Sequence, residues 1–156
     1  MVHSPERVAL LIPLMVAVAL TLGTIVIHGL ALVSAVHFVR GQHRRGVAGI
    51  SFSKDLLIVA AVITVAFAAH VSEMALWALI LRLSGQFSDF AAAFYHSTEN
   101  YTTLGYGDVV MSQNWKLLGP LEATTGMLMF GVSAAAIFAI IQFLFQARVG
   151  NLEAPT

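Results

Sequence analysis

The segment TTLGYGD, residues 102–108, decides how this chain folds. Two glycines flank a tyrosine, two threonines precede them and a carboxylate follows. Polar, flexible backbone of this kind normally runs over a wet surface, yet here it stands between two long apolar stretches. The fold therefore has to accommodate this segment and the apolar stretches together.

The composition points to a membrane. Of 156 residues, 58% are hydrophobic and 10% are charged, which leaves too much apolar surface for one water-soluble globule to cover. Eight Lys and Arg residues balance eight Asp and Glu residues, so no basic excess indicates a nucleic acid partner. The absence of cysteine excludes disulfides, a thiol nucleophile and cysteine metal sites. We therefore expect membrane lipids around the folded chain.

Three apolar segments are long enough to cross a bilayer as helices, which takes about 20 residues each. They span residues 8–39, 56–83 and 117–147. The first contains no Lys, Arg, Asp or Glu and is too long for the core of a signal peptide, so we expect it to be retained. Pro13 is expected one turn inside its start, where proline costs less than at mid-helix.

Basic residues concentrate in the link between the first two spans, residues 40–55. Because cytoplasmic loops carry an excess of Lys and Arg, this link is predicted to face the cytoplasm. The amino terminus and TTLGYGD then face outward, and the carboxyl terminus with Arg148 faces inward. Trp77 and Trp115 are expected in the aromatic belt at the outer interface. The basic residues of the link are Arg40, Arg44, Arg45 and Lys54.

Residues 88–101 predict a short helix before TTLGYGD. Ser88 is a suitable N-cap, and Asp89 in the first turn would favour the helix dipole. A helix of about 14 residues is roughly 21 Å long, too short to cross but long enough to enter the membrane to mid-depth and return. Irregular backbone at that depth is tolerated only where it is buried in protein or lines a watery cavity.

A loop lining such a cavity can bind cations through its own carbonyl oxygens. Gly105 and Gly107 supply the positive φ angles that other residues resist, as such a loop requires. The Thr103 hydroxyl can add an oxygen at the inner end, while the Tyr106 side chain braces the loop from behind. Four copies around an axis would give rings of oxygens, which is how potassium selectivity filters are built.

Residues 103–108, TLGYGD, resemble the signature of the tetrameric potassium channel superfamily, whose filters include Thr-Val-Gly-Tyr-Gly-Asp. Leu104 in place of valine is a mild departure. The pattern GPLEA…G…FG at residues 119–131 is similar to that of small bacterial ion channel proteins. The resemblance covers residues 56–147 and leaves the first span outside.

The resemblance implies an all-α membrane protein with three transmembrane helices and a re-entrant pore helix per subunit, assembled as a homotetramer. It implies a potassium-selective channel, not an enzyme, with a weakly selective cation channel as the alternative. K⁺ ions would bind at the carbonyls of Thr103, Leu104, Gly105, Tyr106 and Gly107. Each subunit would have three parts: an extra helix with a basic loop (1–55), a pore module (56–147) and a short cytoplasmic tail (148–156). The pore module would consist of an outer helix (56–83), a pore helix (88–101), a filter (102–108) and an inner helix (117–147).

Residues behind the expected filter follow from the same resemblance. Tyr95 and Glu99 occupy positions from which they would engage Asp108 and brace the loop. His96 stands where a second large aromatic is common, and Tyr101 where a smaller residue is common. Both departures put the rigidity of the filter in doubt. His96 is interpreted first as a packing residue; the alternative is that it adds pH sensitivity near its ordinary titration range.

Several ionisable residues lie inside the spans, where such groups favour a functional interpretation. His70 and Glu73 share one helix face and are expected to form a hydrogen-bonded pair. This pair would tie the second span to polar groups of the short helix, such as His96 or Asn100. Glu122 is interpreted as a structural hydrogen-bonding group. A different class, a histidine-dependent metal-binding membrane enzyme or transporter, would need His70 and Glu73 to converge with two histidines of the first span, His28 and His37, which otherwise serve packing or the interface.

The last span would line the pore below the filter. Gly126 and Gly131 are its flexible positions, and a bend at Gly131 is the expected gating movement. Phe138, Ile141 and Phe145 recur every three to four residues, so they form either a hydrophobic constriction or a packing face.

Overall fold

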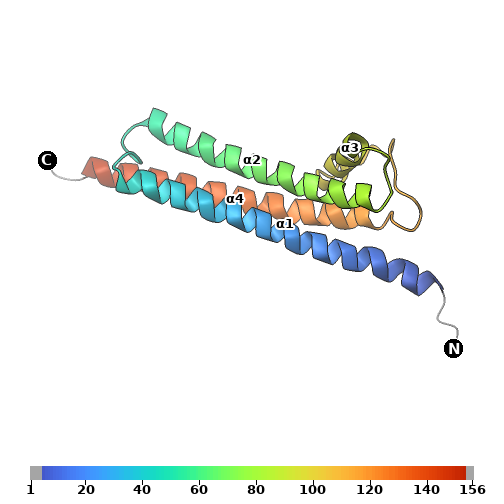
Figure 1. Ribbon diagram of the computed structural model, residues 1–156. Coiled ribbons are helices and arrows are strands. Elements are labelled where there is room, and N and C mark those ends of the chain that lie inside the picture. The colour runs from blue at the N-terminus through green and yellow to red at the C-terminus, as the bar shows by residue number, and fades with distance from the viewer. Residues whose placement is uncertain (1–4, 154–156) are drawn as a thin grey trace. The chain divides into compact units, whose positions relative to one another are not determined.

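The computed structural model describes residues 5–153 and the side chains of residues 11–150. The described chain is entirely helical (Figure 1): α1 covers Pro5–Arg44, α2 Phe52–Leu83, α3 Phe90–Tyr101 and α4 Leu118–Glu153. α1, α2 and α4 are long and apolar enough to cross a membrane, and the short α3 lies between α2 and α4 in the chain. The expectations of an all-α fold and of three helices long and apolar enough to span a membrane are confirmed for the described residues.

The helices extend beyond the apolar runs that predicted them. α1 begins at Pro5, a residue whose fixed φ suits the first position of a helix. Pro13 therefore lies eight residues into α1, and its expected place one turn inside the start is wrong. α4 continues to Glu153, so most of the expected tail is helical, while residues 154–156 fall outside the described residues. Polar residues continue a helix because its hydrogen bonds do not depend on apolar side chains.

The N-cap of α3 also differs from expectation. Asp89, not Ser88, is the cap, and its carboxylate accepts a hydrogen bond from the Ala92 N–H at 2.8 Å. This hydrogen bond lowers the pKa of Asp89 below its usual range, and a second one from the Ser88 hydroxyl at 3.2 Å acts in the same sense. Both residues are good caps. Because α3 begins at Phe90, the residue directly before it, Asp89, occupies the N-cap position.

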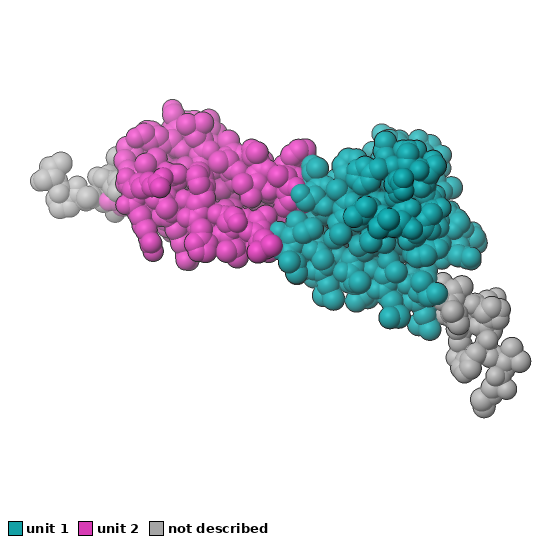
Figure 2. Space-filling view, viewed as in Figure 1, with its two compact units in different colours: residues 1–27, 70–130 teal, residues 28–69, 131–156 magenta. Residues whose placement is uncertain are grey.

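The chain divides into two compact units (Figure 2). The first comprises residues 1–27 and 70–130, and the second residues 28–69 and 131–156. Each long helix contributes one part to each unit. The TTLGYGD segment and α3 belong to the first unit.

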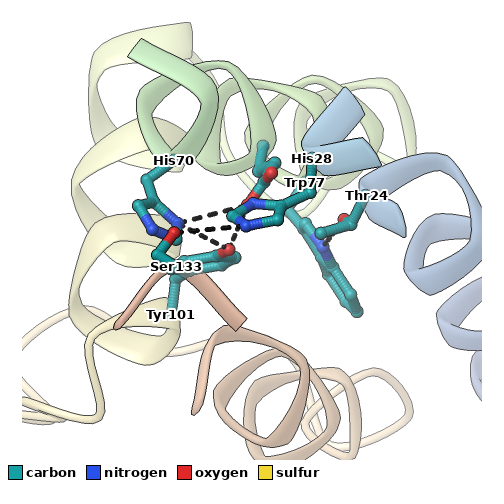
Figure 3. Close-up of polar contacts among 7 residues, drawn as sticks. Thr24, His28, His70, Trp77, Tyr101 and Ser133 are labelled. Atoms are coloured by element: carbon teal, nitrogen blue, oxygen red, sulfur yellow. Dashed lines mark hydrogen bonds and ion pairs between the residues drawn. The ribbon is translucent and has the colours of Figure 1, made fainter. Parts of the chain in front are cut away.

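Trp77 lies at the centre of the first unit. It has no exposed surface, and its indole N–H donates to the Thr24 hydroxyl at 3.2 Å (Figure 3). The prediction that Trp77 lies in an aromatic belt is therefore wrong. Its indole can be buried because Thr24 supplies an acceptor for the N–H. Trp115 is partly buried against the same core. The core consists of Ala17, Leu20, Trp77, Ala78, Leu81, Ala93, Met111 and Leu118.

The second unit joins the end of α4 to the loop between α1 and α2. Asp55 accepts a hydrogen bond from the Gly49 N–H at 2.8 Å and forms an ion pair with Arg148 through its other oxygen. Gly49 has a φ of 79°, and a Cβ there would lie 2.8 Å from the Ala147 carbonyl carbon, so only glycine fits. The apolar core of this unit consists of Ala35, Val39, Ala48, Ile58, Val62, Ile140 and Leu144.

α4 meets the end of α3 backbone to backbone. A Cβ on Gly126 would overlap the Tyr101 carbonyl oxygen and lie 2.9 Å from the carbonyl carbon. Gly126, expected to be a flexible position, is thus a position of close approach. The contact fixes the end of α3, from which the TTLGYGD segment starts.

The substitution Gly126→Ala should destabilise the protein. The added methyl must displace backbone at the end of α3, and such overpacking costs about 1–3 kcal/mol. The apparent melting temperature in detergent, followed by tryptophan fluorescence, should fall. Gly29→Ala in α1 is the control, since a Cβ there meets no atom within 4 Å. Equal melting temperatures for the two variants would contradict the close approach.

Candidate functional site

The TTLGYGD backbone alternates in handedness. Thr103, Gly105 and Gly107 have φ angles of 61°, 54° and 75°, whereas Leu104 and Tyr106 between them do not have positive φ. The positive φ angles expected of the two glycines are confirmed. Left-handed backbone at Thr103 was not anticipated, because a β-branched residue rarely adopts it. Inverting every second residue turns successive carbonyls toward the same side, where an ordinary strand alternates them.

The first N–H groups of this loop bond back to α3. Thr103 N–H donates to the Asn100 carbonyl at 2.8 Å, and Leu104 and Gly105 donate to the Glu99 carbonyl at 2.8 and 3.2 Å. In the part of the chain that the structure describes, no hydrogen bond reaches the carbonyls of residues 103–107. These residues are all exposed in the single chain. The loop therefore presents exposed carbonyl acceptors, while the N–H groups of its first residues, 103–105, are bonded to α3.

Tyr95 connects α3 to the far end of the loop. Its hydroxyl donates to Asp108 Oδ2 at 3.1 Å, and a hydrogen bond to Glu99, desolvation and the Asp108 carboxylate raise the pKa of Tyr95 to about 12. The hydroxyl thus stays protonated and remains a donor. Glu99 is buried, and its Oε1 has no partner among the described residues. Within one chain Tyr95 thus bonds to Asp108, while the described residues show no direct hydrogen bond between Glu99 and Asp108.

His96 holds the segment that follows the loop. Its Nδ1 lies 2.7 Å from the Val109 carbonyl oxygen, and its Nε2 lies 2.8 Å from the Asn100 amide nitrogen. A carbonyl only accepts, so Nδ1 carries the proton and Nε2 accepts from Asn100. Burial lowers the pKa of His96, and the opposing effects of the Val109 carbonyl and of the Glu99 and Asp108 carboxylates do not outweigh it. Neutral His96 therefore braces the loop.

Tyr101 ends α3 in a buried polar contact with α2. Its side chain has no exposed surface, and its hydroxyl donates to the Glu73 carboxylate. His70 Nδ1 lies 3.2 Å from the same hydroxyl (Figure 3). It also lies 3.3 Å from Glu73 Oε2. His70 and Glu73 do tie α2 to the short helix, but the expected partners were wrong. The partner is Tyr101 and not His96 or Asn100, because the Tyr101 ring is long enough to place its hydroxyl beside Glu73 and His70 of α2.

Ser97 fixes the middle of α3 to both neighbouring helices. Its hydroxyl hydrogen-bonds to the Glu122 carboxyl of α4 and to the Met74 carbonyl of α2, the latter at 2.8 Å. Ser97 and Glu122 are both fully buried. Glu122 thus serves as the structural hydrogen-bonding group that the sequence predicted.

The remaining candidate residues lie in the second unit. His28 Nε2 lies 3.2 Å from the Ser133 hydroxyl (Figure 3), and His37 Nδ1 lies 2.8 Å from the Val33 carbonyl of its own helix. α4 continues through Gly131 as one helix. The apolar candidates for a constriction, Phe138, Ile141 and Phe145, are exposed in the single chain.

Comparison with known proteins gives one match. Residues 57–143, more than half of the chain, match the family model described as "Ion channel". This range includes nearly all of α2, the whole of α3 with the TTLGYGD loop, and most of α4. Neither the curated proteins nor the solved structures contain a significant match.

Removing the Tyr101 hydroxyl should destabilise the protein. Tyr101→Phe removes the hydrogen bond that the Tyr101 hydroxyl donates to the buried Glu73 carboxylate, a loss of about 1–3 kcal/mol. The apparent melting temperature in detergent should fall. Glu73→Gln keeps an acceptor oxygen for Tyr101 and should lose less. A Tyr101→Phe variant as stable as the wild type would show that this hydrogen bond does not anchor α3.

The His96 contacts predict a pH dependence. The unfolded chain binds a proton at His96 below about pH 6.5, the ordinary value, whereas the folded chain resists it. The contribution of neutral His96 to the free energy of unfolding is therefore fully present above that pH and is lost as the pH falls below it. Between about pH 7.5 and about pH 5.5 the wild-type melting temperature should fall more than that of His96→Gln. His37→Gln is the control and should follow the wild type; parallel profiles for all three would contradict the assignment.

Proposed function

Because this chain belongs to the ion channel family, we propose that it forms a homotetrameric pore that conducts K⁺ passively across the cell membrane. The observation that carries the proposal is the backbone of residues 103–107, with alternating positive φ and carbonyls that lack hydrogen-bond partners among the described residues. Such carbonyls can replace the water shell of a cation. The TTLGYGD loop is then the selectivity filter.

In this pore each subunit contributes one quarter of every oxygen ring. The carbonyls of five consecutive residues form the rings, and the Thr103 hydroxyl adds oxygen at the inner mouth. The side chains of Leu104 and Tyr106 are 54% and 69% exposed in one chain, which suits residues that pack against a neighbouring subunit. The ion-binding residues are Thr103, Leu104, Gly105, Tyr106 and Gly107.

α3 would be the re-entrant pore helix. Its 12 residues span about 18 Å, too little to cross the membrane. Its carboxyl end leads directly into the filter, so the negative end of its dipole favours a cation below the filter. The basic link of residues 40–55 would then face the cytoplasm, and both the filter mouth and the amino terminus the outside.

Strict potassium selectivity is favoured over the weakly selective alternative by the contacts around α3. His96 and Tyr101, the two departures from the usual sequence, bond to the Val109 carbonyl and to Glu73. Tyr95 adds a hydrogen bond to Asp108. These bonds restrain both ends of the loop, and a restrained loop keeps its carbonyls at the spacing one ion requires.

The gate would lie in α4. Phe138, Ile141 and Phe145 are 61%, 45% and 67% exposed in one chain, so they are available to meet across the axis of a tetramer. A ring of such side chains blocks ions by excluding water. Gly131 has no neighbouring atom that would restrict a bend, since a Cβ there meets nothing within 4 Å.

Reversal potentials in K⁺/Na⁺ gradients across a reconstituted bilayer test the proposal. The wild type should reverse near the K⁺ equilibrium potential. Gly107→Ala adds a Cβ where φ is 75°, a strain of about 1 kcal/mol or more, and should abolish or degrade the preference for K⁺.

Gly85→Ala is a matched control for this measurement. Gly85 has a φ of 71° in the loop after α2, and like Gly107 it has no atom within 4 Å of an added Cβ. The two substitutions therefore strain the backbone alike, but only Gly107 lies in the proposed filter. Wild-type selectivity in Gly107→Ala, or equal loss in both variants, would overturn the assignment.

A further inference from the structure

The part of α1 in the first unit packs into the same core as α3. α1 lies outside residues 57–143, the range that matches the ion channel family, and the proposed pore assigns no role to it. Yet Ala17 and Leu20 of α1 are 3% and 6% exposed. They belong to one apolar cluster with Ala93 of α3 and with Met111, which follows the TTLGYGD loop. α1 is therefore part of the core that supports the loop.

Thr21 of α1 forms a hydrogen bond with α4. Its hydroxyl oxygen lies 2.9 Å from that of Thr125, which is buried. The Thr125 hydroxyl has one proton and donates it to the Leu121 carbonyl at 3.0 Å, so Thr21 is the donor to Thr125. Threonines in helices often bond within their own helix, as Thr124 does to the Pro120 carbonyl at 2.9 Å. The bond from Thr21 to Thr125 instead joins two helices.

Thr125 is next to the glycine that contacts the end of α3. A Cβ on Gly126 would overlap the Tyr101 carbonyl oxygen, so this face of α4 must carry glycine. With 3.6 residues per turn, successive residues point about 100° apart, so Thr125 faces α1 while Gly126 faces α3. A rotation of α4 that broke the bond to Thr21 would also bring a side chain toward the Tyr101 carbonyl. The hydrogen bond therefore fixes the rotation of α4 that this contact requires.

Thr24 of α1 holds α2 in a similar way. It accepts the indole N–H of Trp77 at 3.2 Å (Figure 3), and both side chains are fully buried. Gly23 permits this close approach, since a Cβ there would lie 3.0 Å from a side chain of α2. Trp77 lies three residues after Met74, whose carbonyl accepts the Ser97 hydroxyl of α3 at 2.8 Å. α1 therefore binds both flanking helices close to the points where they hold α3.

We propose that Thr21 and Thr24 are positioning residues of the TTLGYGD loop. They fix α4 and α2 against α1, and these two helices fix α3, whose last carbonyls hold the N–H groups of residues 103–105. α1 then keeps the loop carbonyls at the spacing that K⁺ requires, without touching an ion. The effect on ions rests on the proposed function, whereas the effect on the loop can be measured without conduction.

Hydrogen exchange of the detergent-purified full chain, followed by mass spectrometry, tests the effect on the loop. Thr21→Val removes the hydroxyl with little change of shape. It should speed exchange at residues 103–105 about threefold, the factor that an average interhelical hydrogen bond in a membrane corresponds to. Thr125→Val should do the same, and serves alone if Thr21→Val does not fold. The double variant should exchange no faster than either single one, because both remove the same bond.

Thr124→Val is the matched control, since Thr124 is exposed and its hydrogen bond lies within α4. It should leave exchange at residues 103–105 unchanged. Residues 52–60, at the start of α2 in the second unit, are the internal reference for general destabilisation. Unchanged exchange at residues 103–105 in Thr21→Val and Thr125→Val, or equal acceleration in Thr124→Val or at residues 52–60, would overturn the proposal.

Reversal potentials in K⁺/Na⁺ gradients test the effect on ions. In Thr21→Val and Thr24→Val the K⁺/Na⁺ permeability ratio should fall several-fold, whereas Thr21→Ser keeps the hydroxyl and should retain the wild-type ratio. An unchanged ratio in both valine variants of a K⁺-selective wild type would contradict the positioning role. A wild type without K⁺ preference would instead overturn the proposed function, and the exchange experiment would then decide on the positioning by itself.

Discussion

The hydrogen bonds between the carboxyl end of α3 and the first residues of TTLGYGD are the constraint on which the site depends. The carbonyls of Glu99 and Asn100 bind the N–H groups of residues 103–105, so the chain reverses immediately after the helix. A helix end normally gives its last carbonyls to water or to a cap. Here the loop itself is the cap, and its own carbonyls remain available for another partner.

α3 holds this geometry because it is fixed on every side by polar contacts in an otherwise apolar unit. Tyr101 bonds to Glu73 of α2, Ser97 to Glu122 of α4, and His96 to the Val109 carbonyl after the loop. Each buried polar group would be costly alone, so each contact is strongly favoured once the helix is in place. The apolar packing sets how close the helices lie, and these hydrogen bonds set the register of α3 between them.

Local chemistry made part of the structure predictable from the sequence. The three spans follow from apolar length, and the positive φ of Gly105 and Gly107 from the lack of a Cβ. The features that the sequence predicted wrongly depend on contacts with residues distant in sequence. Trp77 suits an interface or a core equally well until Thr24, 53 residues away, supplies an acceptor. Tyr101 looked too bulky for its position because nothing local shows that Glu73 receives its hydroxyl.

The contact between Gly126 and the Tyr101 carbonyl has a mechanical consequence. Side chains absorb small displacements by changing rotamer, whereas two stretches of main chain in contact have no such freedom. The junction is therefore stiff, and a shift of α4 at Gly126 passes to Tyr101 and on to the loop that begins at the next residue. In the proposed pore, the part of α4 before Gly131 and the loop that carries the ions would therefore move together, whereas a bend at Gly131 would move the gate and leave this junction in place.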